Sequence, residues 1–560
     1  MTKETNETPS KTTYFVGVDV GTGSVRAALV DNRGKFHKTS TKDTKTWTPK
    51  AGYYEQSTDD IWSACCSVVK DVTEGVPAAD VKGVGFDATC SLVAVDKDGK
   101  PLTISPTGEN ARNVMLWLDH RAIEEASFIN GLGHPVLKYV GGTISLEMET
   151  PKLLWLKKNL RKECWDRAGW FFDLPDFLTW RATGADSRSL CSLVCKWTYV
   201  AGAEGAEAAG WSLDFFTQAG LAELAEGGWR KIGAEVKEPG APCGAGLSER
   251  AAGELGLLAG TPVGTSMIDA HAGALGLLGC SAPGVPRDFH TRLGLVCGTS
   301  TCHMAVSRDP LFVRGVWGPY RSALVPGYWL NEGGQSATGK LVDHVIETHP
   351  AASSARAKAG GRHIQEYLLD LLKEMAERQN LPCVAMLTKD VHVWPDFHGN
   401  RSPLADPSLQ GMICGLTLSA DEENLAVVYL ATIQALAYGT RHITEALARS
   451  GHVFRCLLMC GGLSRSPLFV QTQADAAGLP VLCPCQPESV LLGAAILGAC
   501  AAGTHSSVPA AVQAMGGPAA VVRPRELDRS YHEKKYKVFL RMVEHQKEYR
   551  NIMSDFIVLK

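Results

Sequence analysis

Two copies of one short pattern constrain the fold of this chain more than any other feature. The first copy, FVGVDVGTGSVRAALVD, runs from Phe15 to Asp31, and its two apolar runs flank a turn of small residues. The second copy, RLGLVCGTSTCHMAVSR, aligns with the first at a constant offset and without a gap. The matched residues are Gly17, Gly21, Thr22 and Ala28 in the first copy and Gly294, Gly298, Thr299 and Ala305 in the second. A repeated strand-turn-strand unit predicts two related halves, each offering a Gly-Thr turn to a shared cleft.

The turn of the first copy, from Gly21 to Ser24, suits a bound phosphate. Glycine lets backbone N–H groups approach an anion, and the hydroxyls of Thr22 and Ser24 add donors beside them. Asp19, in the preceding run, offers a carboxylate that would hold Mg²⁺ through water, because a hard cation prefers oxygen ligands. A purely structural hairpin fits the first copy alone equally well, but the second copy favours a nucleotide held between two phosphate turns. A dinucleotide fingerprint fits less well, since Arg26 stands where the third glycine would be.

Acidic side chains stand at the ends of two further apolar runs. Asp87 follows the run from Val84 to Phe86 and is next to the small residue Ala88. An acid at a strand end binds sugar hydroxyls as readily as it caps a turn, so both roles stay open here. Asp269 follows a short apolar run and precedes Ala-His-Ala-Gly, which leaves open space before its carboxylate. A helix N-cap and a fragment of a metal site are the alternatives, although no other ligand lies nearby at metal-binding spacing.

Two other stretches combine charge with apolar surroundings. MLWLDHRA alternates Trp117, Asp119 and Arg121, and a β-like run would point all three to one side. An aromatic face with charged hydrogen-bonding groups suits the wall of a sugar site, and a packed tryptophan beside a surface ion pair is equally compatible. Lys196 lies in the small and apolar stretch RSLCSLVCKWTY, where a buried ammonium needs an acidic or carbonyl partner.

Two glycine-rich segments in the second half need to be distinguished. Residues 334–340 begin like a Walker A loop, but Leu341 replaces the Ser or Thr that would hold Mg²⁺, so we reject that interpretation. LLMCGGLSRSP predicts a strand, a turn at Gly461 and Gly462, and a helix. Paired glycines at a strand end let a flat ligand lie against the backbone.

Together these motifs resemble the FGGY family of carbohydrate kinases over a span from Tyr14 to Ala502, and CSLVCK and HGNRSPLADP resemble its ribulose kinase branch. The resemblance implies an α/β fold of two actin-like domains, of the hexokinase, heat-shock ATPase and ribonuclease H-like group, with ATP and sugar in a central cleft. It implies an N-terminal domain over residues 13–290, with the sugar site, the first phosphate turn and the catalytic aspartate. A C-terminal domain over residues 291–560 would hold the second turn, the adenosine site and a terminal helix. Residues 1–12 are expected to be a disordered tail.

The resemblance also implies a role for individual residues. Asp269 would be the general base, and as an ordinary aspartate it would be ionised at neutral pH. The implied substrate-binding residues are Asp87, Ala88, Trp117, Asp119, Lys196, Asp269 and Glu332. The implied ATP-binding residues are Gly21, Thr22, Gly23, Ser24, Arg26, Gly298, Thr299, Ser300, Gly461, Gly462 and Ser466, with Asp19 near Mg²⁺.

Composition narrows the partners of the chain. A formal net charge of −3 over 560 residues provides no electrostatic argument for a nucleic acid or an anionic membrane as partner. The polar start of the chain lacks the apolar segment of a secretory signal. The 17 cysteines show neither C-x-x-C pairs nor Cys/His ligand spacing, which favours buried thiols in a reducing compartment. We therefore expect a cytoplasmic protein that binds ATP and a small sugar, and a homodimer is compatible with this.

The favoured hypothesis is an enzyme that transfers the γ-phosphoryl group of Mg²⁺-bound ATP to a ketopentose, with D-ribulose 5-phosphate as product. The alternative within the same class is a kinase for another pentulose or polyol, namely L-ribulose, xylulose or ribitol. Two other classes are a partner-driven ATPase of the actin or heat-shock type and a catalytically silent sugar sensor. Asp269, Lys196 and Glu332 argue against the partner-driven ATPase, which would not need this set of sugar-site residues. A silent sensor predicts the loss of Asp269 or of a Gly-Thr turn, and the sequence retains both.

Overall fold

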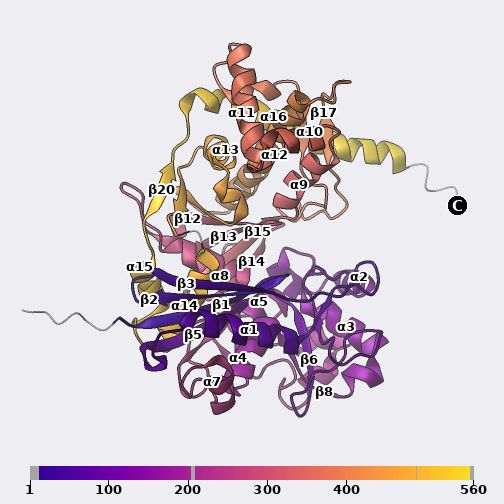
Figure 1. Cartoon of the computed structure of the whole chain (residues 1–560). Helices are drawn as coiled ribbons and strands as arrows, with labels where there is room; N and C mark the ends of the chain where they lie inside the picture. Colours follow the sequence, from indigo (N-terminus) through magenta and orange to yellow (C-terminus); the bar gives the residue numbers. More distant parts are fainter. Residues whose placement is uncertain (1–11, 203–208, 487, 555–560) are drawn as a thin grey trace, which may run out of the picture.

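Two sheets that share an order of five strands form the centre of the molecule, as a computed structural model shows for residues 12–202, 209–486 and 488–554 (Figure 1). The first sheet has the order β11-β5-β1-β2-β3 and the second the order β14-β15-β13-β12-β18-β19-β20. The first comprises β1 (Tyr14–Val20), β2 (Ser24–Asp31), β3 (Phe36–Asp43), β5 (Val81–Ala88) and β11 (Val263–Ile268). The second comprises β12 (Arg292–Cys297), β13 (Thr301–Ser307), β14 (Trp317–Arg321), β15 (Trp329–Gln335), β18 (Cys456–Cys460), β19 (Val481–Pro484) and β20 (Ala519–Val522).

The internal repeat of the sequence is a repeat of topology. In each sheet an antiparallel hairpin, β1-β2 or β12-β13, continues into parallel strands on its other side, β5 and β11 or β18 and β19. The second hairpin is one residue shorter, since Val20 pairs with Val25 but Cys297 pairs with Thr301. The ungapped alignment of Ala28 with Ala305 is therefore wrong by one position beyond the turn. The actin-like two-domain α/β fold itself is confirmed.

Two central helices, α8 (Asp269–Leu278) and α14 (Ser489–Ala501), join the halves. Helix α8 follows the last strand of the first sheet but packs on the second, where Gly273 lies against Val296. Helix α14 follows β19 of the second sheet but packs on the first. Its backbone comes so close that a Cβ on Gly85 would lie 1.9 Å from the carbonyl oxygen of Ala494. The predicted C-terminal unit, 291–560, thus includes a helix that packs on the N-terminal sheet.

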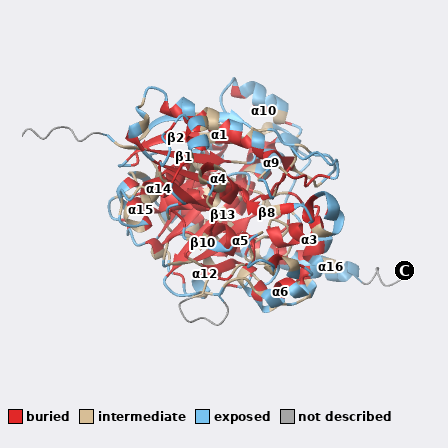
Figure 2. Ribbon diagram, turned by 90° about the horizontal axis from the view of Figure 1, so that it is seen from below, coloured by how far each residue is buried: buried red, intermediate tan, exposed pale blue. Residues whose placement is uncertain are grey.

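The outer faces of the sheets carry the remaining helices. Helices α1 (Thr58–Thr73), α4 (Leu174–Thr183) and α7 (Glu249–Leu255) enclose an apolar core with the first sheet. Helices α9 (Gly339–Thr348), α11 (Ile364–Arg378), α12 (Glu422–Arg449) and α13 (Pro467–Ala477) do so with the second, and α16 (Glu526–Ser554) packs near α13. Figure 2 shows the buried residues running through the sheets and central helices.

The predicted tail falls outside the described residues except for Thr12, which precedes β1. None of the described helices combines the length and apolar character needed to cross a membrane.

Candidate active site

Three aspartates lie side by side at the carboxyl ends of three parallel strands. Asp19 on β1 pairs in register with Asp87 on β5, and Met267 on β11 pairs with Asp87 on the other side. Asp269 follows two residues later as the first residue of α8. Ligands of α/β sheets bind beyond this edge. The arrangement explains why acids that are distant in sequence occupy one site.

Mutual repulsion and burial set the protonation of these acids. Burial and the carboxylate of Asp19 raise the pKa of Asp87 well above its usual range, and neither oxygen of Asp87 meets a donor of good hydrogen-bond geometry. The same two causes raise the pKa of Asp269 to about 7. The expectation that Asp269 behaves as an ordinary aspartate is therefore wrong for the unliganded protein. Two unpartnered buried oxygens beside a second carboxylate are suited to a cation.

Arg26 compensates part of this negative charge. Its Nε donates to Oδ2 of Asp19 at 2.8 Å, and its Nη1 donates to Oε2 of Glu488 at 2.8 Å. Glu488 immediately precedes α14, so the arginine connects the first hairpin to the segment that returns from the second sheet. The guanidinium thus stands next to the first turn, where it would also face a phosphate.

Each Gly-Thr turn is closed by a backbone hydrogen bond from its glycine, and the second turn is one residue shorter. The N–H of Gly21 donates to the carbonyl of Ser24 at 2.9 Å, and the N–H of Gly298 donates to that of Ser300 at 2.8 Å. Thr22, Gly23 and Thr299 are exposed at the tips. The indole of Trp117 donates to the hydroxyl of Thr22 at 3.1 Å. Each turn therefore presents hydroxyl and backbone donors to the space beyond its sheet.

The predicted adenosine segment lies next to the second turn. Gly461 follows β18, and a Cβ there would lie 2.3 Å from the carbonyl oxygen of Cys297, at a φ of 92° that favours glycine. Gly462 is exposed. Ser466 caps α13, because its hydroxyl oxygen accepts the N–H of Phe469 at 3.4 Å. The side chain of Ser466 also forms a hydrogen bond with Tyr429 of α12.

A second charged group draws on both halves of the molecule. Lys196 ends α5 (Leu190–Lys196), and Glu332 lies on β15. The guanidinium of Arg401 forms an ion pair with Glu332 and lies 4.0 Å from the ring centroid of Trp317. The ammonium of Lys196 lies 4.5 Å from the same centroid and 3.7 Å from the carboxylate of Glu147. An aromatic face among buried charges is typical of a sugar pocket.

In this group, ion pairing shifts the pKa values of Glu332 and Lys196 more than burial does. Burial would raise the pKa of Glu332, but Lys196 and Arg401 lower it below its ordinary value. Burial would likewise lower the pKa of Lys196, but the neighbouring Cys90, Glu332 and Glu147 raise it. Glu332 keeps one oxygen, Oε2, without a hydrogen-bond partner. An ionised carboxylate oxygen held in this way can accept a hydrogen bond from a hydroxyl group of a ligand.

Sequence reasoning missed part of this group. Arg401 lies in HGNRSPLADP, where a lone positive charge in a proline- and glycine-rich loop was the available signal. Glu147 and Trp317 carried no local signal, because their role depends on which elements meet in space.

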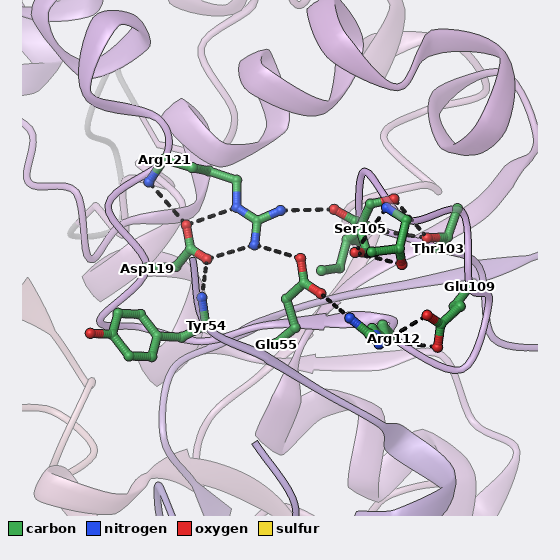
Figure 3. Close-up of polar contacts among 10 residues, drawn as sticks. Tyr54, Glu55, Thr103, Ser105, Glu109, Arg112, Asp119 and Arg121 are labelled. Carbon is green, nitrogen blue, oxygen red and sulfur yellow. Dashed lines mark hydrogen bonds and ion pairs between the residues drawn. The ribbon is translucent and has the colours of Figure 1, made fainter. Parts of the chain in front are cut away.

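The predicted β-like run from Trp117 to Arg121 is wrong, since β7 covers only Val114–Met115 and a turn follows. Asp119 and Arg121 are buried, and Arg121 forms ion pairs with both Asp119 and Glu55, as Figure 3 shows.

Both oxygens of Asp119 are occupied in that network. Oδ2 accepts the N–H of Tyr54 at 2.7 Å and Nη2 of Arg121 at 2.7 Å, while Oδ1 accepts Nε of Arg121 at 2.9 Å. Of Trp117, Asp119 and Arg121, Trp117 is the residue that contacts a Gly-Thr turn, through the hydroxyl of Thr22. Ala88, the last residue of β5, is buried beside Asp87.

Two actin-like halves with a Gly-Thr turn on each, acids at strand ends and a charged aromatic group are features of a phosphotransferase that acts on a small polar acceptor. Family models described as the FGGY family of carbohydrate kinases match residues 14–276 (N-terminal domain) and 293–502 (C-terminal domain). The chain belongs to this family and is an ATP-dependent sugar kinase.

Two relatives illustrate the range of similarity. An "FGGY carbohydrate kinase domain-containing protein" from Homo sapiens is 53% identical over 552 residues, which cover 97% of this chain and 98% of that protein. A protein named D-ribulokinase from Saccharomyces cerevisiae is 40% identical over 514 residues, covering 87% of this chain and 72% of its own.

Solved structures agree with the fold. A ligand-bound xylulose kinase from Lactobacillus acidophilus has a TM-score of 0.78 at 18% identity, covering 97% of this chain and 100% of its own. A Plasmodium falciparum glycerol kinase with ADP has a TM-score of 0.73 at 14% identity, covering 95% of this chain and 98% of its own.

Proposed function

We propose that this kinase phosphorylates D-ribulose on its terminal hydroxyl, giving D-ribulose 5-phosphate and ADP. The observation that carries the proposal is the 40% identity to the yeast protein named D-ribulokinase, over most of the chain. Bacterial proteins named ribulokinase are about equally extensive matches at lower identity, for example 31% over 537 residues in Geobacillus thermodenitrificans. The pocket supports an acceptor with several hydroxyls, because Lys196, Glu332 and Arg401 offer both donors and an acceptor around Trp317.

In the proposed mechanism Asp269 accepts the proton of the attacking hydroxyl. This role is supported by its position as the first residue of α8, beside the acidic ends of β1 and β5. Asp87, Ala88, Trp117, Lys196 and Glu332 would hold the sugar, and Asp119 would act by keeping the Trp117 turn in place. The turns at Thr22 and Thr299 would bind phosphate oxygens, with Arg26 and Ser300 beside them, and Gly461, Gly462 and Ser466 would meet the nucleoside.

The acidic strand ends fit Mg²⁺. Asp19 and Asp87 are adjacent in register, and the oxygens of Asp87 are buried without donors, so a hard dication would relieve their repulsion. Asp19 is the residue proposed to hold the metal, through water. Bound there, Mg²⁺ would neutralise charge on the transferring phosphoryl group.

A reducing compartment is part of the proposal, since all 17 cysteines are free thiols. Light scattering of the purified chain would measure whether it forms the expected homodimer.

A coupled ADP-release assay over D-ribulose, L-ribulose, D-xylulose, ribitol and glycerol tests the substrate. We expect D-ribulose to have the highest kcat/KM, by several orders of magnitude over the wrong epimers, because buried polar groups left unpaired discriminate strongly. The Asp269→Asn variant reports the background rate of ATP hydrolysis. A higher kcat/KM for xylulose or glycerol would overturn the assignment while leaving the kinase class intact.

A further inference from the structure

Two thiols and an imidazole converge next to the charged pocket. Cys191 and Cys195 lie one turn apart on α5, and His271 lies on the first turn of α8. All three side chains are fully buried, and their sulfur and nitrogen atoms lie within 4.8 Å of one another. Among the described residues, no other group of three metal-binding side chains lies this close together.

The distances match a tetrahedral metal site. Sγ of Cys195 lies 3.4 Å from Nε2 of His271, and the same nitrogen lies 3.5 Å from Oε2 of Glu332. Zinc bonds of about 2.3 Å to sulfur and about 2.0–2.1 Å to nitrogen or oxygen separate such ligands by about 3.4–3.5 Å at the tetrahedral angle. Oε2 of Glu332 has no hydrogen-bond partner. Oε2 approaches the imidazole but lies outside the group that the two thiols form with it, so the Glu332 side chain would turn toward the thiols to become the fourth ligand.

We propose that Cys191, Cys195, His271 and Glu332 form a Zn²⁺ site within the sugar pocket. Two thiolates and an imidazole select a borderline-soft ion over Mg²⁺, which prefers oxygen alone. Sequence spacing does not reveal the site, because its ligands come from α5, α8 and β15 and span residues 191–332.

Charge balance is compatible with binding despite the nearby cations. The two thiols release two protons to solvent when Zn²⁺ binds, so the total charge of the site stays the same. The net charge that Lys196 and Arg401 face at the site is therefore the same with zinc as without it. Because protons are released, zinc affinity rises with pH.

Zinc and sugar would exclude each other. Glu332 cannot accept a sugar hydroxyl through Oε2 while that oxygen binds the metal. This consequence rests on the role proposed for Glu332, whereas the zinc site itself does not. Ligands from both halves of the molecule also mean that zinc would hold α5 and β15 together.

Direct metal binding tests the site in the full-length protein, prepared metal-free under reducing conditions. Added Co²⁺ should bind one equivalent and give the thiolate-to-cobalt charge-transfer absorption and the visible bands of a tetrahedral site, and one equivalent of Zn²⁺ should remove them. Absence of the charge-transfer band in the wild-type protein overturns the proposal without any variant.

Variants then assign the ligands. Cys191→Ser and Cys195→Ser should each weaken Zn²⁺ binding at least about tenfold, as for other losses from a metal centre. Cys164→Ser, at an equally buried cysteine far from α5 in the sequence, is the matched control and should bind normally. Stoichiometric binding that survives both test variants would contradict the site.

Steady-state kinetics test the exclusion separately. Zn²⁺ should raise the apparent KM for the sugar in the wild type and not in Cys191→Ser, and a chelator should reverse the effect. Zinc that binds one equivalent but leaves the sugar KM unchanged would retain the metal site and contradict the role of Glu332.

Discussion

At the scale of single residues, the carboxylate of Asp269 carries the chemistry that we propose. Asp269→Asn keeps the shape and removes the basicity, so turnover should fall roughly 10²- to 10⁴-fold, the range for losing a general base. Calorimetric affinity for ATP should change little, because the substitution leaves both Gly-Thr turns intact. Asp98→Asn, the same change on an exposed turn, is the control. Near-normal turnover would remove Asp269 from the mechanism and make Asp87 the next candidate.

Arg121 tests whether the buried network of Figure 3 is structural. Its guanidinium pairs with Asp119 and Glu55 at 2.7 and 2.9 Å, and all three side chains are inaccessible. Arg121→Met would leave the buried Asp119 without an ion-pair partner and Glu55 with Arg112 alone, at 3.8 Å, so we expect a loss of about 3–5 kcal/mol, seen as a lower thermal midpoint. Arg161→Met, at an exposed ion pair, should cost about 0–1 kcal/mol. An unchanged midpoint with a raised sugar KM would instead place Arg121 in the pocket.

What sequence could predict follows from how local each signal is. The turns at Thr22 and Thr299, and the acids at Asp19, Asp87 and Asp269, end apolar runs, and adjacency in a parallel sheet brings the acids together. The alternation of Trp117, Asp119 and Arg121 predicted a strand that does not form. Arg121 instead donates a hydrogen bond to Glu55, which lies 66 residues earlier, so the local pattern could not reveal this contact. Arg401, Trp317 and the Cys191 site depend on contacts between distant elements.

At the scale of elements, the contact between α8 and α14 depends on glycine. A Cβ on Gly276 of α8 would lie 2.1 Å from the carbonyl oxygen of Ser489, whereas one on Gly253 of α7 would meet nothing within 4 Å. Gly276→Ala should therefore destabilise the protein by about 1–3 kcal/mol through overpacking. Gly253→Ala should be neutral or stabilising by up to about 1 kcal/mol, because alanine is the better helix former. Equal thermal midpoints for the two variants would contradict the close packing.

Glu254 ties α7 to two other helices in a pH-dependent way. Burial would raise its pKa, but Arg181 of α4 and the indole of Trp62 on α1, which donates at 2.7 Å, lower it to about 2. A lowered folded-state pKa contributes stability above the unfolded value of about 4.5, and this is lost as pH falls toward 2.

We therefore expect Glu254→Gln to have a lower thermal midpoint than wild type at pH 7, with the gap closing between pH 4.5 and pH 2. The exposed Glu226→Gln is the control and should show no such trend. A gap that is constant with pH would mean that packing, not charge, accounts for the effect.

At the scale of the whole molecule, the two central helices join the halves into one packed unit. Each central helix packs on the sheet of the other half, so the halves share one continuous apolar core. The sugar side is already joined by Trp317 and Lys196, which come from different halves. Motion that brings the Gly-Thr turns together must therefore pivot near this contact and slide α8 along α14.

This geometry predicts closure on ligand binding. Turns on separate sheets grip one nucleotide only if the halves approach, and a packed helix pair permits small shear motions of this kind. We expect a smaller radius of gyration, by small-angle scattering, with a non-hydrolysable ATP analogue and D-ribulose together than with either alone. Glycerol in place of D-ribulose is the control. An unchanged radius with both ligands bound would contradict a clamp, because the two turns would then have to reach one nucleotide without any approach of the sheets that carry them.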